Sequence, residues 1–514
     1  MSTDDIRAHL NSAKIVPLRG SGNAFDRMPP NDFNGRMSEL DRTDFGNGQR
    51  LIGRFGDDFM YVRNIGYFHW EGRFWNQHGA EEQVQKFAHQ TVQSMEEEIA
   101  ARLTRNGDLP EWNPTECRLH REWANQSGMS QKIANMMKES RPYLTESVDV
   151  LDADLRTINL QNGILRIEGN CDQLQTHERD PRLSKMMPVT YDPSAKCPTF
   201  TTFLHQVQPD PDIRRFLQMW FGYCLTGETS EQRLVFFHGT GSNGKSVMVD
   251  TMAHIMGPYQ KVLAFQSIAQ EKQARGSDAT PDIAELPGAR MVRVSEPEQG
   301  VQFAEGKIKE MTGGEAITAR NFYKGFFEFV PQFKLTISGN HKPQIRGQDE
   351  GIWRRFILVP WGVYIPPSAR DRNLLIKLRQ ESSGILNWML EGARLWLRHG
   401  LVVPKSIDAA TLSYREESDP LGRFIEDTLA YQAGVNVRAS ELFEAYEAWC
   451  KRTGERPWKQ TTFGSALKDR MCDNQPIRKE RYGGNVYYCN IRVELPMPDP
   501  ADSTTEHIDD GDLS

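Results

Sequence analysis

Residues 236–250 read FFHGTGSNGKSVMVD, and this stretch decides the fold of the chain around it. Gly239, Gly244, Lys245 and Ser246 satisfy the pattern G-x-x-x-x-G-K-[ST], with the apolar run RLVFF before the loop and the helical pattern SVMVDTMAHIM after it. A strand, a glycine loop and a helix in this order form a phosphate-binding loop, because backbone N–H groups and the helix N-terminus converge on one anion. The flanking strand and helix disfavour the alternative of a glycine turn that only caps a helix.

The loop residues are the first candidates for binding ATP and Mg²⁺. The Lys245 ammonium would reach the β and γ phosphates, and the Ser246 hydroxyl would ligate Mg²⁺. The predicted nucleotide-binding residues are Gly239, Thr240, Gly241, Ser242, Asn243, Gly244, Lys245 and Ser246. Hydrolysis also requires acids that hold the metal ion and polarise water, and these must come from elsewhere in the chain.

The segment GARMVRVSEPEQG supplies such acids at the end of an apolar strand over residues 291–294. Carboxylates at the carboxyl end of a strand beside a phosphate loop suit both tasks. We assign Glu296 to the Mg²⁺ shell and leave Glu298 open, either as an outer acid or as the catalytic base. An ordinary polar strand end is the alternative, and the upstream phosphate loop makes it much less attractive.

Two further segments complete the predicted catalytic set. The strand FKLTISGN ends in Asn340, whose amide would orient the attacking water or touch the γ-phosphate. The segment DEGIWRRFILVPW carries Arg354 and Arg355, and an arginine from a neighbouring subunit can offset charge on the transferred phosphoryl group. Taken alone, Asn at a strand end is usually a turn former, and paired arginines are usually a solvated patch. The sequence does not decide which arginine acts.

Composition sets outer bounds on the function. The 514 residues suffice for roughly three domains, and the content of 38% apolar and 25% charged residues is that of a soluble globular protein. No apolar run is long enough to cross a bilayer, and the polar N-terminus is not a secretory signal, which together predict a cytoplasmic location. The seven scattered cysteines predict reduced thiols without a zinc site. With a net charge of -7, any DNA partner requires a local basic surface.

The chain divides into five predicted parts within an overall α/β fold. Residues 1–44 form a flexible leader, and residues 45–228 form a small mixed α+β region that begins with short strands in DFGNGQRLIGRFGDDFMYV. Residues 229–404 form the parallel α/β core with trailing helices, and residues 405–493 form three helices followed by a hairpin that turns at YGGN. Residues 494–514 form an acidic, disordered tail.

The order of motifs resembles the superfamily 3 helicases, in the branch of phage and plasmid primase-helicases and their poxvirus relatives. The motifs are GTGSNGKS, SEPE, KEMTGGEAITARNFYKGFFEF, FKLTISGNHKPQIRG and DEGIWRRFILVPW, in that order. The resemblance implies an AAA+ type core that assembles as a ring, usually a hexamer, with ATP between subunits and single-stranded DNA in the channel. It also implies that Glu296 is the Walker B acid, Asn340 the sensor, and Arg354 or Arg355 the finger.

Two surfaces are predicted to contact DNA. The resemblance implies a DNA-gripping hairpin whose tip is NFYKG, with Phe322, Tyr323 and Lys324 suited to stacking and phosphate pairing; a core aromatic pair beside a surface lysine is the alternative. The C-terminal helices and hairpin look like a winged helix, in which Arg478, Lys479 and Arg481 of the wing could contact phosphates. A winged helix can equally dock proteins.

The family often carries a primase domain ahead of the helicase, and this chain has too little sequence before residue 45 to hold one. The acidic cluster Asp149, Asp152 and Asp154 in DVLDADL is interpreted as a solvated turn, so a primase is expected to be a separate protein. The leading hypothesis is an ATP-dependent DNA helicase that unwinds forked DNA. The alternative is an ATP-switched replication initiator or scaffold that does not unwind processively, and a metabolic phosphotransferase ranks third.

Overall fold

The computed structural model describes residues 30–103, 109–169, 173–270, 280–297, 300–322, 325–345 and 350–494. These residues form two compact units: the first comprises the chain up to Pro343 together with Arg354–Ile407, and the second comprises Gln344–Trp353 together with the chain from Asp408. The predicted acidic tail after residue 494 and most of the predicted leader lie outside the described residues.

A five-stranded parallel sheet forms the centre of the first unit, as the α/β prediction requires. Its order is β14-β8-β13-β10-β9, and every neighbouring pair is parallel. The connection after β8 leads to β9 at one edge of the sheet, and the connection after β13 leads to β14 at the other edge. Parallel sheets bind ligands where the direction of the connections changes, which here is at the carboxyl ends of β8 and β13. The strands are β8 (Leu234–His238), β9 (Gln260–Leu263), β10 (Met291–Val294), β13 (Lys334–Gly339) and β14 (Phe356–Pro360).

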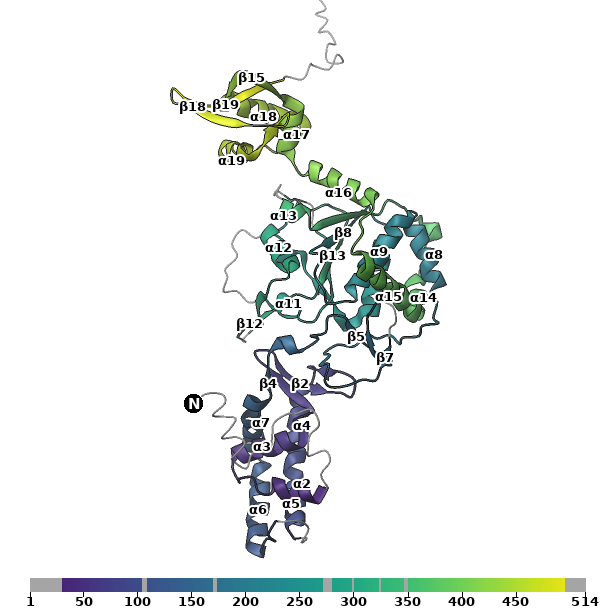
Figure 1. Ribbon diagram of the computed structural model, residues 1–514, viewed down its shortest axis with the longest axis vertical. Helices are drawn as coiled ribbons and strands as arrows, with labels where there is room; N and C mark the ends of the chain where they lie inside the picture. The colour runs from purple at the N-terminus through teal and green to yellow at the C-terminus, as the bar shows by residue number, and fades with distance from the viewer. Residues whose placement is uncertain are drawn as a thin grey trace, which may run out of the picture. The chain divides into compact units, whose positions relative to one another are not determined.

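Alternate residues of the sheet face two different layers. Val235 and Phe237 of β8 join the large core beneath the helices, whereas Phe236 stacks against Phe356, which in turn packs against Phe303. Figure 1 shows this helical layer, with α12 (Glu305–Gly313) on the opposite face. The helices of the layer are α8 (Pro198–Val207), α9 (Pro211–Cys224), α10 (Lys245–Met256), α14 (Leu374–Gln380) and α15 (Ser382–His399).

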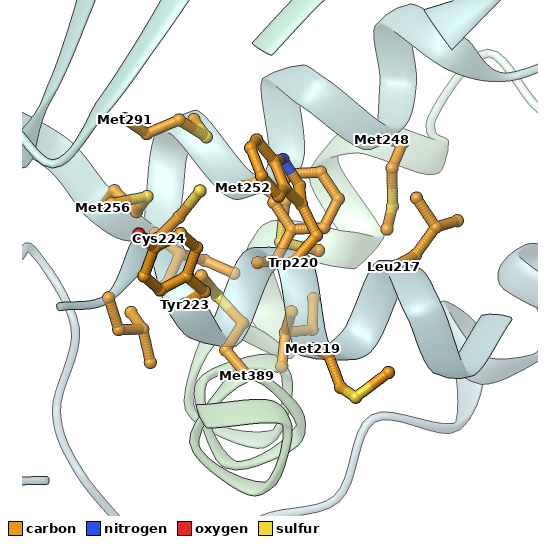
Figure 2. Packing of buried hydrophobic residues seen from close by; sticks show 14 of the residues in the cluster. Leu217, Met219, Trp220, Tyr223, Cys224, Met248, Met252, Met256, Met291 and Met389 are labelled. Carbon is orange, nitrogen blue, oxygen red and sulfur yellow. The ribbon is translucent and has the colours of Figure 1, made fainter. Parts of the chain in front are cut away.

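Methionines and aromatic rings fill the space between α9, α10 and α15. Figure 2 shows Met248 and Met252 of α10 close to Trp220, whose indole N–H donates to Thr336 Oγ1 of β13 at 3.1 Å. The backbones of α9 and α15 nearly touch, because a Cβ added at Gly392 would lie 1.8 Å from the carbonyl oxygen of Gln218. The helix that follows the glycine loop therefore rests on a closely packed platform.

The domain boundary predicted between residues 228 and 229 lies within one continuous hydrophobic core, because α9 and the parallel sheet contribute to the same cluster of buried apolar residues. The strand, turn and strand predicted in TINLQNGILRI are present as β5 and β6, and β7 joins them. Asp152, interpreted from sequence as part of a solvated turn, is instead buried: it accepts from the Ser184 N–H at 2.9 Å, with Lys185 Nζ 3.6 Å away. The strands are β5 (Thr157–Leu160), β6 (Gly163–Arg166) and β7 (Leu174–Gln175).

The N-terminal part of the first unit combines helices with a small mixed sheet of order β3-β2-β1-β4. Glu98 is fully buried there and accepts from Arg50 Nε at 3.1 Å and Arg54 Nη2 at 2.9 Å, with His120 Nε2 3.2 Å away. The elements are α2 (Pro30–Met37), α3 (Asp44–Phe55), β1 (Phe59–Val62), β2 (Gly66–Trp70), β3 (Trp75–Asn76), α4 (Ala80–Gln93), α5 (Met95–Leu103), α6 (Pro114–Ser127), α7 (Ser130–Leu144) and β4 (Thr145–Glu146).

Two parts of this region differ from the sequence prediction. Within the predicted leader, residues 30–37 form α2, and Met37 and Leu40 are buried. Residues 44–55 form a helix where short strands were expected. Its glycines serve close packing, because a Cβ at Gly46 would lie 2.0 Å from the Asp41 carbonyl oxygen and a Cβ at Gly48 would lie 2.9 Å from α7.

The second unit has its own core of buried apolar residues. Along the chain, its main elements are a helix, a strand, two helices and a two-stranded hairpin. The hairpin turns at Gly483 and Gly484, whose φ values of 55° and 84° suit a tight two-residue turn. The strand β15 is the part that the sequence prediction lacked. The elements are α13 (Glu350–Trp353), α16 (Lys405–Glu417, which starts in the first unit), α17 (Pro420–Thr428), β15 (Leu429–Arg438), α18 (Ala439–Thr453), α19 (Gln460–Ala466), β16 (Met471–Cys472), β17 (Gln475–Pro476), β18 (Arg478–Tyr482) and β19 (Asn485–Val493).

In the part of the chain that the structure describes, no helix combines the length and the apolar character needed to span a membrane.

Candidate nucleotide site and nucleic-acid surfaces

The glycine loop joins β8 to α10 in the strand, loop and helix context that the sequence predicts. Gly244 stands directly before α10 with φ 84°, and Gly241 has φ 97°, values that glycine adopts without strain. A Cβ at Gly239 would lie 2.3 Å from the Trp361 carbonyl oxygen, and the Asn243 amide donates to the same oxygen at 3.0 Å. The loop is therefore fixed to the chain that follows β14.

Lys245 is buried, with 6% of the residue exposed, and its amine lies inside the loop. It donates to the Gly239 carbonyl at 2.6 Å and to Asn340 Oδ1 at 3.2 Å. Burial lowers the pKa of this amine, and the nearby Glu296 carboxylate partly opposes that change. The lysine is thus held in the loop by neutral oxygens that an anionic phosphate can replace.

Asn340 connects the loop to the acidic strand. It follows β13, which lies between β8 and β10 in the sheet, and its backbone N–H donates to Glu296 Oε1 at 2.6 Å. Lys245, Asn340 and Glu296 therefore come together at the carboxyl edge of three neighbouring strands. Glu298 lies outside the described residues.

The donor set beside the loop suits Mg²⁺. Ser246 stands in the first turn of α10 with an exposed side chain, and Glu296 supplies a carboxylate. Magnesium bound with a nucleotide takes one or two protein oxygens, and phosphate and water complete its octahedron. Among the described residues, no group of three or more His, Cys, Asp or Glu side chains gathers as a self-sufficient metal site.

The two candidate arginines lie directly before β14, at the amino-terminal ends of the parallel strands. The glycine loop lies at the opposite, carboxyl-terminal ends. Arg355 is 7% exposed and its Nε donates to Thr312 Oγ1 at 3.1 Å, whereas Arg354 is exposed and donates to Gln232 Oε1 at 3.1 Å. Strands of five residues separate the amino-terminal ends from the glycine loop by about 16 Å. Neither side chain can therefore reach the loop of its own chain.

A cavity of about 680 Å³ opens beside the loop. Helix α8, the loop with the start of α10, and the segment after β14 line it, and Phe203, Val247, Ile365 and Leu374 form apolar walls. This cavity was not predictable from sequence, because residues from α8 and from the segment after β14 meet only in the folded chain. Its size and lining suit a nucleoside.

The hairpin expected around NFYKG is present in the first unit. Strands β11 (Ile317–Arg320) and β12 (Phe326–Phe329) pair in antiparallel register, and Phe322 at the start of the connection is 60% exposed. The Arg320 guanidinium lies 4.7 Å from the centre of the Phe326 ring, and Thr280 N–H donates to the Arg320 carbonyl at 3.0 Å. The short helix α11 (Pro281–Ala284) follows Thr280. Tyr323 and Lys324 lie outside the described residues.

The basic residues of the predicted wing are all exposed on β18. Alternation along the strand sends Lys479 and Arg481 to one face and Arg478 to the other. The Lys479 amine lies 5.9 Å from the ring of Tyr488, its neighbour on β19. Two of the three basic side chains thus share a face.

Comparison with known proteins bears out the resemblance. Residues 48–209 match the family described as "D5 N terminal like", and residues 416–488 match the one described as "Poxvirus D5 protein-like". The chain is related to the D5-like primase-helicases. Residues 237–355, which hold the glycine loop and Asn340, match a "Family of unknown function (DUF5906)".

Curated relatives come from large DNA viruses. A "Putative helicase" of Acanthamoeba polyphaga mimivirus is 30% identical over 278 residues, which are 50% of this chain and 29% of the relative. A "Putative helicase" of Frog virus 3 is 28% identical over 48% of this chain and 27% of its own length. A "Putative primase" of African swine fever virus is 19% identical over 59% of this chain and 34% of its own length. The matches thus span about a third or less of these relatives.

A solved structure also aligns with much of the chain. It is the apo structure of the NrS-1 C terminal region, with 10% identity, a TM-score of 0.37, and coverage of 66% of this chain and 95% of that one.

Proposed function

We propose that this protein is a superfamily 3 DNA helicase of phage or plasmid type, which hydrolyses ATP with Mg²⁺ to move along single-stranded DNA and unwind duplex. The observation that carries the proposal is the meeting of Lys245, Asn340 and Glu296 beside the glycine loop. A phosphate-binding lysine, a water-orienting amide and a carboxylate are the groups that hydrolysis of a nucleoside triphosphate requires. The relatives named as helicases support the same role.

The proposed steps follow from the contacts at the loop. When phosphate enters, the Lys245 amine exchanges the Gly239 carbonyl and the Asn340 amide oxygen for phosphate oxygens. Asn340 then turns its amide toward the attacking water, while its backbone N–H keeps Glu296 in position. Ser246 and Glu296 would hold Mg²⁺, which neutralises charge on the phosphates. The nucleoside enters the cavity between α8 and the segment after β14.

Arg354 is the proposed finger, and it acts on a neighbouring subunit. Its exposed side chain and its distance from its own loop both favour a role in trans, whereas Arg355 is committed to a buried hydrogen bond. An arginine supplied by the next copy requires assembly, which supports a homo-hexameric ring of AAA+ type. Hydrolysis then depends on ring formation.

Single-stranded DNA is the proposed ligand of the hairpin between β11 and β12. The exposed Phe322 offers a stacking surface, and Tyr323 and Lys324 complete the predicted tip. The helix and strand order of the second unit supports a winged helix, and Lys479 and Arg481 on β18 would contact phosphates. Stacking on aromatic rings and contacts to phosphates do not depend on base sequence, so sequence-independent binding is expected.

Strand displacement tests this proposal. Purified protein with ATP and Mg²⁺ should separate a forked duplex, and Lys245→Ala should abolish the activity. Lys86→Ala, which removes an exposed lysine on α4 far from the loop, is the matched control and should keep full activity. If Lys245→Ala and wild type displace strand equally, or neither does, the proposal is wrong.

The alternative is an ATP-switched initiator or scaffold, which the exposed basic strand β18 favours. Both functions predict nucleotide and DNA binding. They separate at Lys324→Ala, which abolishes unwinding under the helicase proposal but leaves the binding of duplex by the second unit unchanged. Measuring displacement and duplex affinity on the same preparation decides between them.

A further inference from the structure

The chain after β14 crosses the glycine loop and is bound to it. The Ile365 N–H donates to the Ser242 carbonyl at 2.8 Å, and the Arg370 side chain donates from Nη2 to Ser242 Oγ at 2.8 Å. Arg370 Nε donates to the Ile365 carbonyl at 3.1 Å, across the short 3₁₀ turn Pro367–Ala369. A guanidinium therefore lies at the rim of the loop.

Arg370 also lines the cavity beside the loop, together with Ser242 and Gly244. Both of its partners are neutral oxygens, and no carboxylate in the described part of the chain forms an ion pair with it. The neighbouring Asp371 is engaged elsewhere, since it accepts from Lys377 Nζ at 2.7 Å and from the Asn373 N–H at 2.9 Å. Asp371 also lines the cavity, and the hydrogen bond from Lys377 lowers the pKa of its carboxyl, so the ionised carboxylate is paired with that lysine and not with Arg370.

We propose that Arg370 binds the phosphate chain of the nucleotide held in its own subunit, and that it leaves Ser242 to do so. A planar guanidinium fork matches phosphate oxygens, and a charge-assisted contact outcompetes one to a hydroxyl. Because the segment that carries Arg370 also forms one wall of the cavity, this exchange brings the wall against the nucleoside. The inference rests on the proposed nucleotide site but not on unwinding.

Arg370 and Arg354 then serve different subunits. Arg370 contacts the loop of its own chain, whereas Arg354 lies at the amino-terminal ends of the strands and serves the neighbouring copy. The site is accordingly completed by one arginine in cis and one in trans.

Equilibrium binding of ATPγS with Mg²⁺ to the full chain tests the inference. Arg370→Ala should weaken binding about tenfold, the effect of one lost charge-assisted contact, and Arg370→Lys should restore part of the affinity. Arg372→Ala, which removes an equal exposed charge that does not line the cavity, is the matched control and should bind like wild type. Affinity for adenosine, measured by competition, should be the same in Arg370→Ala and wild type, because adenosine carries no phosphate.

Three results would overturn the inference. Equal weakening of adenosine and ATPγS in Arg370→Ala would mean that the arginine only supports the cavity wall. Wild-type affinity of Arg370→Ala for ATPγS, alongside loss of binding in Lys245→Ala, would remove Arg370 from the site and leave the proposed function standing. Failure of wild type to bind ATPγS would overturn both. Mixing gives an independent check: because both residues act on the nucleotide of their own subunit, an equal mixture of Arg370→Ala and Lys245→Ala should hydrolyse ATP no faster than the average of the two variants, and a faster mixture would overturn the inference.

Discussion

Alanine substitution of the two adjacent arginines before β14 should give opposite results. Arg355 is 7% exposed and its Nε donates to Thr312 Oγ1, which itself donates to the Ile308 carbonyl. Arg355→Ala loses a charged hydrogen bond in a buried setting, which costs about 2 kcal/mol of the free energy of unfolding. The first unit holds about 400 residues. At an unfolding entropy of about 2.1 cal/mol/K per residue, that loss lowers Tm by roughly 2–3 °C.

Arg354→Ala should leave Tm within about 1 °C of wild type, because the side chain is exposed and its contact with Gln232 lies at the surface. It should instead lower kcat for ATP hydrolysis about 10³-fold, as expected for loss of an arginine finger. Thermal unfolding by circular dichroism and steady-state hydrolysis at saturating single-stranded DNA measure the two effects. The assignment is refuted if Arg355→Ala loses hydrolysis at an unchanged Tm while Arg354→Ala hydrolyses ATP normally.

Three further predictions concern packing, acid stability and catalysis. Gly392→Ala should lower Tm by several degrees, because its Cβ would lie 1.8 Å from a carbonyl oxygen of α9. Gly306→Ala in α12 is the control and should keep or raise Tm, because a Cβ there would have no atom within 4 Å. Equal shifts of Tm in thermal unfolding would contradict this prediction. Burial alone would raise the pKa of Glu98, but the adjacent His120 imidazole and two arginine charges lower it overall. Its stabilising contribution is therefore present above about pH 4.3 and lost as the pH falls further, so Glu98→Gln should be less stable than wild type in urea at pH 7, with the gap narrowing in acid. Asn340→Ala should lower kcat about 100-fold with a smaller change in KM, and a change in KM alone in steady-state kinetics would exclude the water-orienting role.

Much of the arrangement of the candidate nucleotide site was predictable from sequence. The loop residues are contiguous, so their pattern carries the geometry with it, and Glu296 and Asn340 each end an apolar strand that the pattern identifies. What the sequence could not give is the order of the strands. The sheet inserts β13 between β8 and β10, and only this order brings Asn340 within reach of both Lys245 and Glu296.

The features that could not be predicted from sequence share one cause, because the burial of a residue depends on partners that are distant in the chain. Gly46 and Gly48 made residues 44–55 look like turns, yet in the fold they allow α3 to approach its neighbours. Arg354 and Arg355 are equivalent in sequence, and only the packing of Arg355 against α12 separates them. Arg370 stands in a polar segment without a motif and meets the loop across 128 residues of sequence.

ATP hydrolysis with and without single-stranded DNA, by wild type and by an equal mixture of Lys245→Ala and Arg354→Ala, tests whether the protein works as a ring with shared nucleotide sites. In a ring with shared sites, a subunit with an intact loop can receive the arginine of its neighbour. The account therefore predicts that DNA stimulates wild-type hydrolysis and that the mixture hydrolyses ATP faster than either variant alone. Hydrolysis that ignores DNA, together with a mixture no faster than the average of its two components, would contradict it.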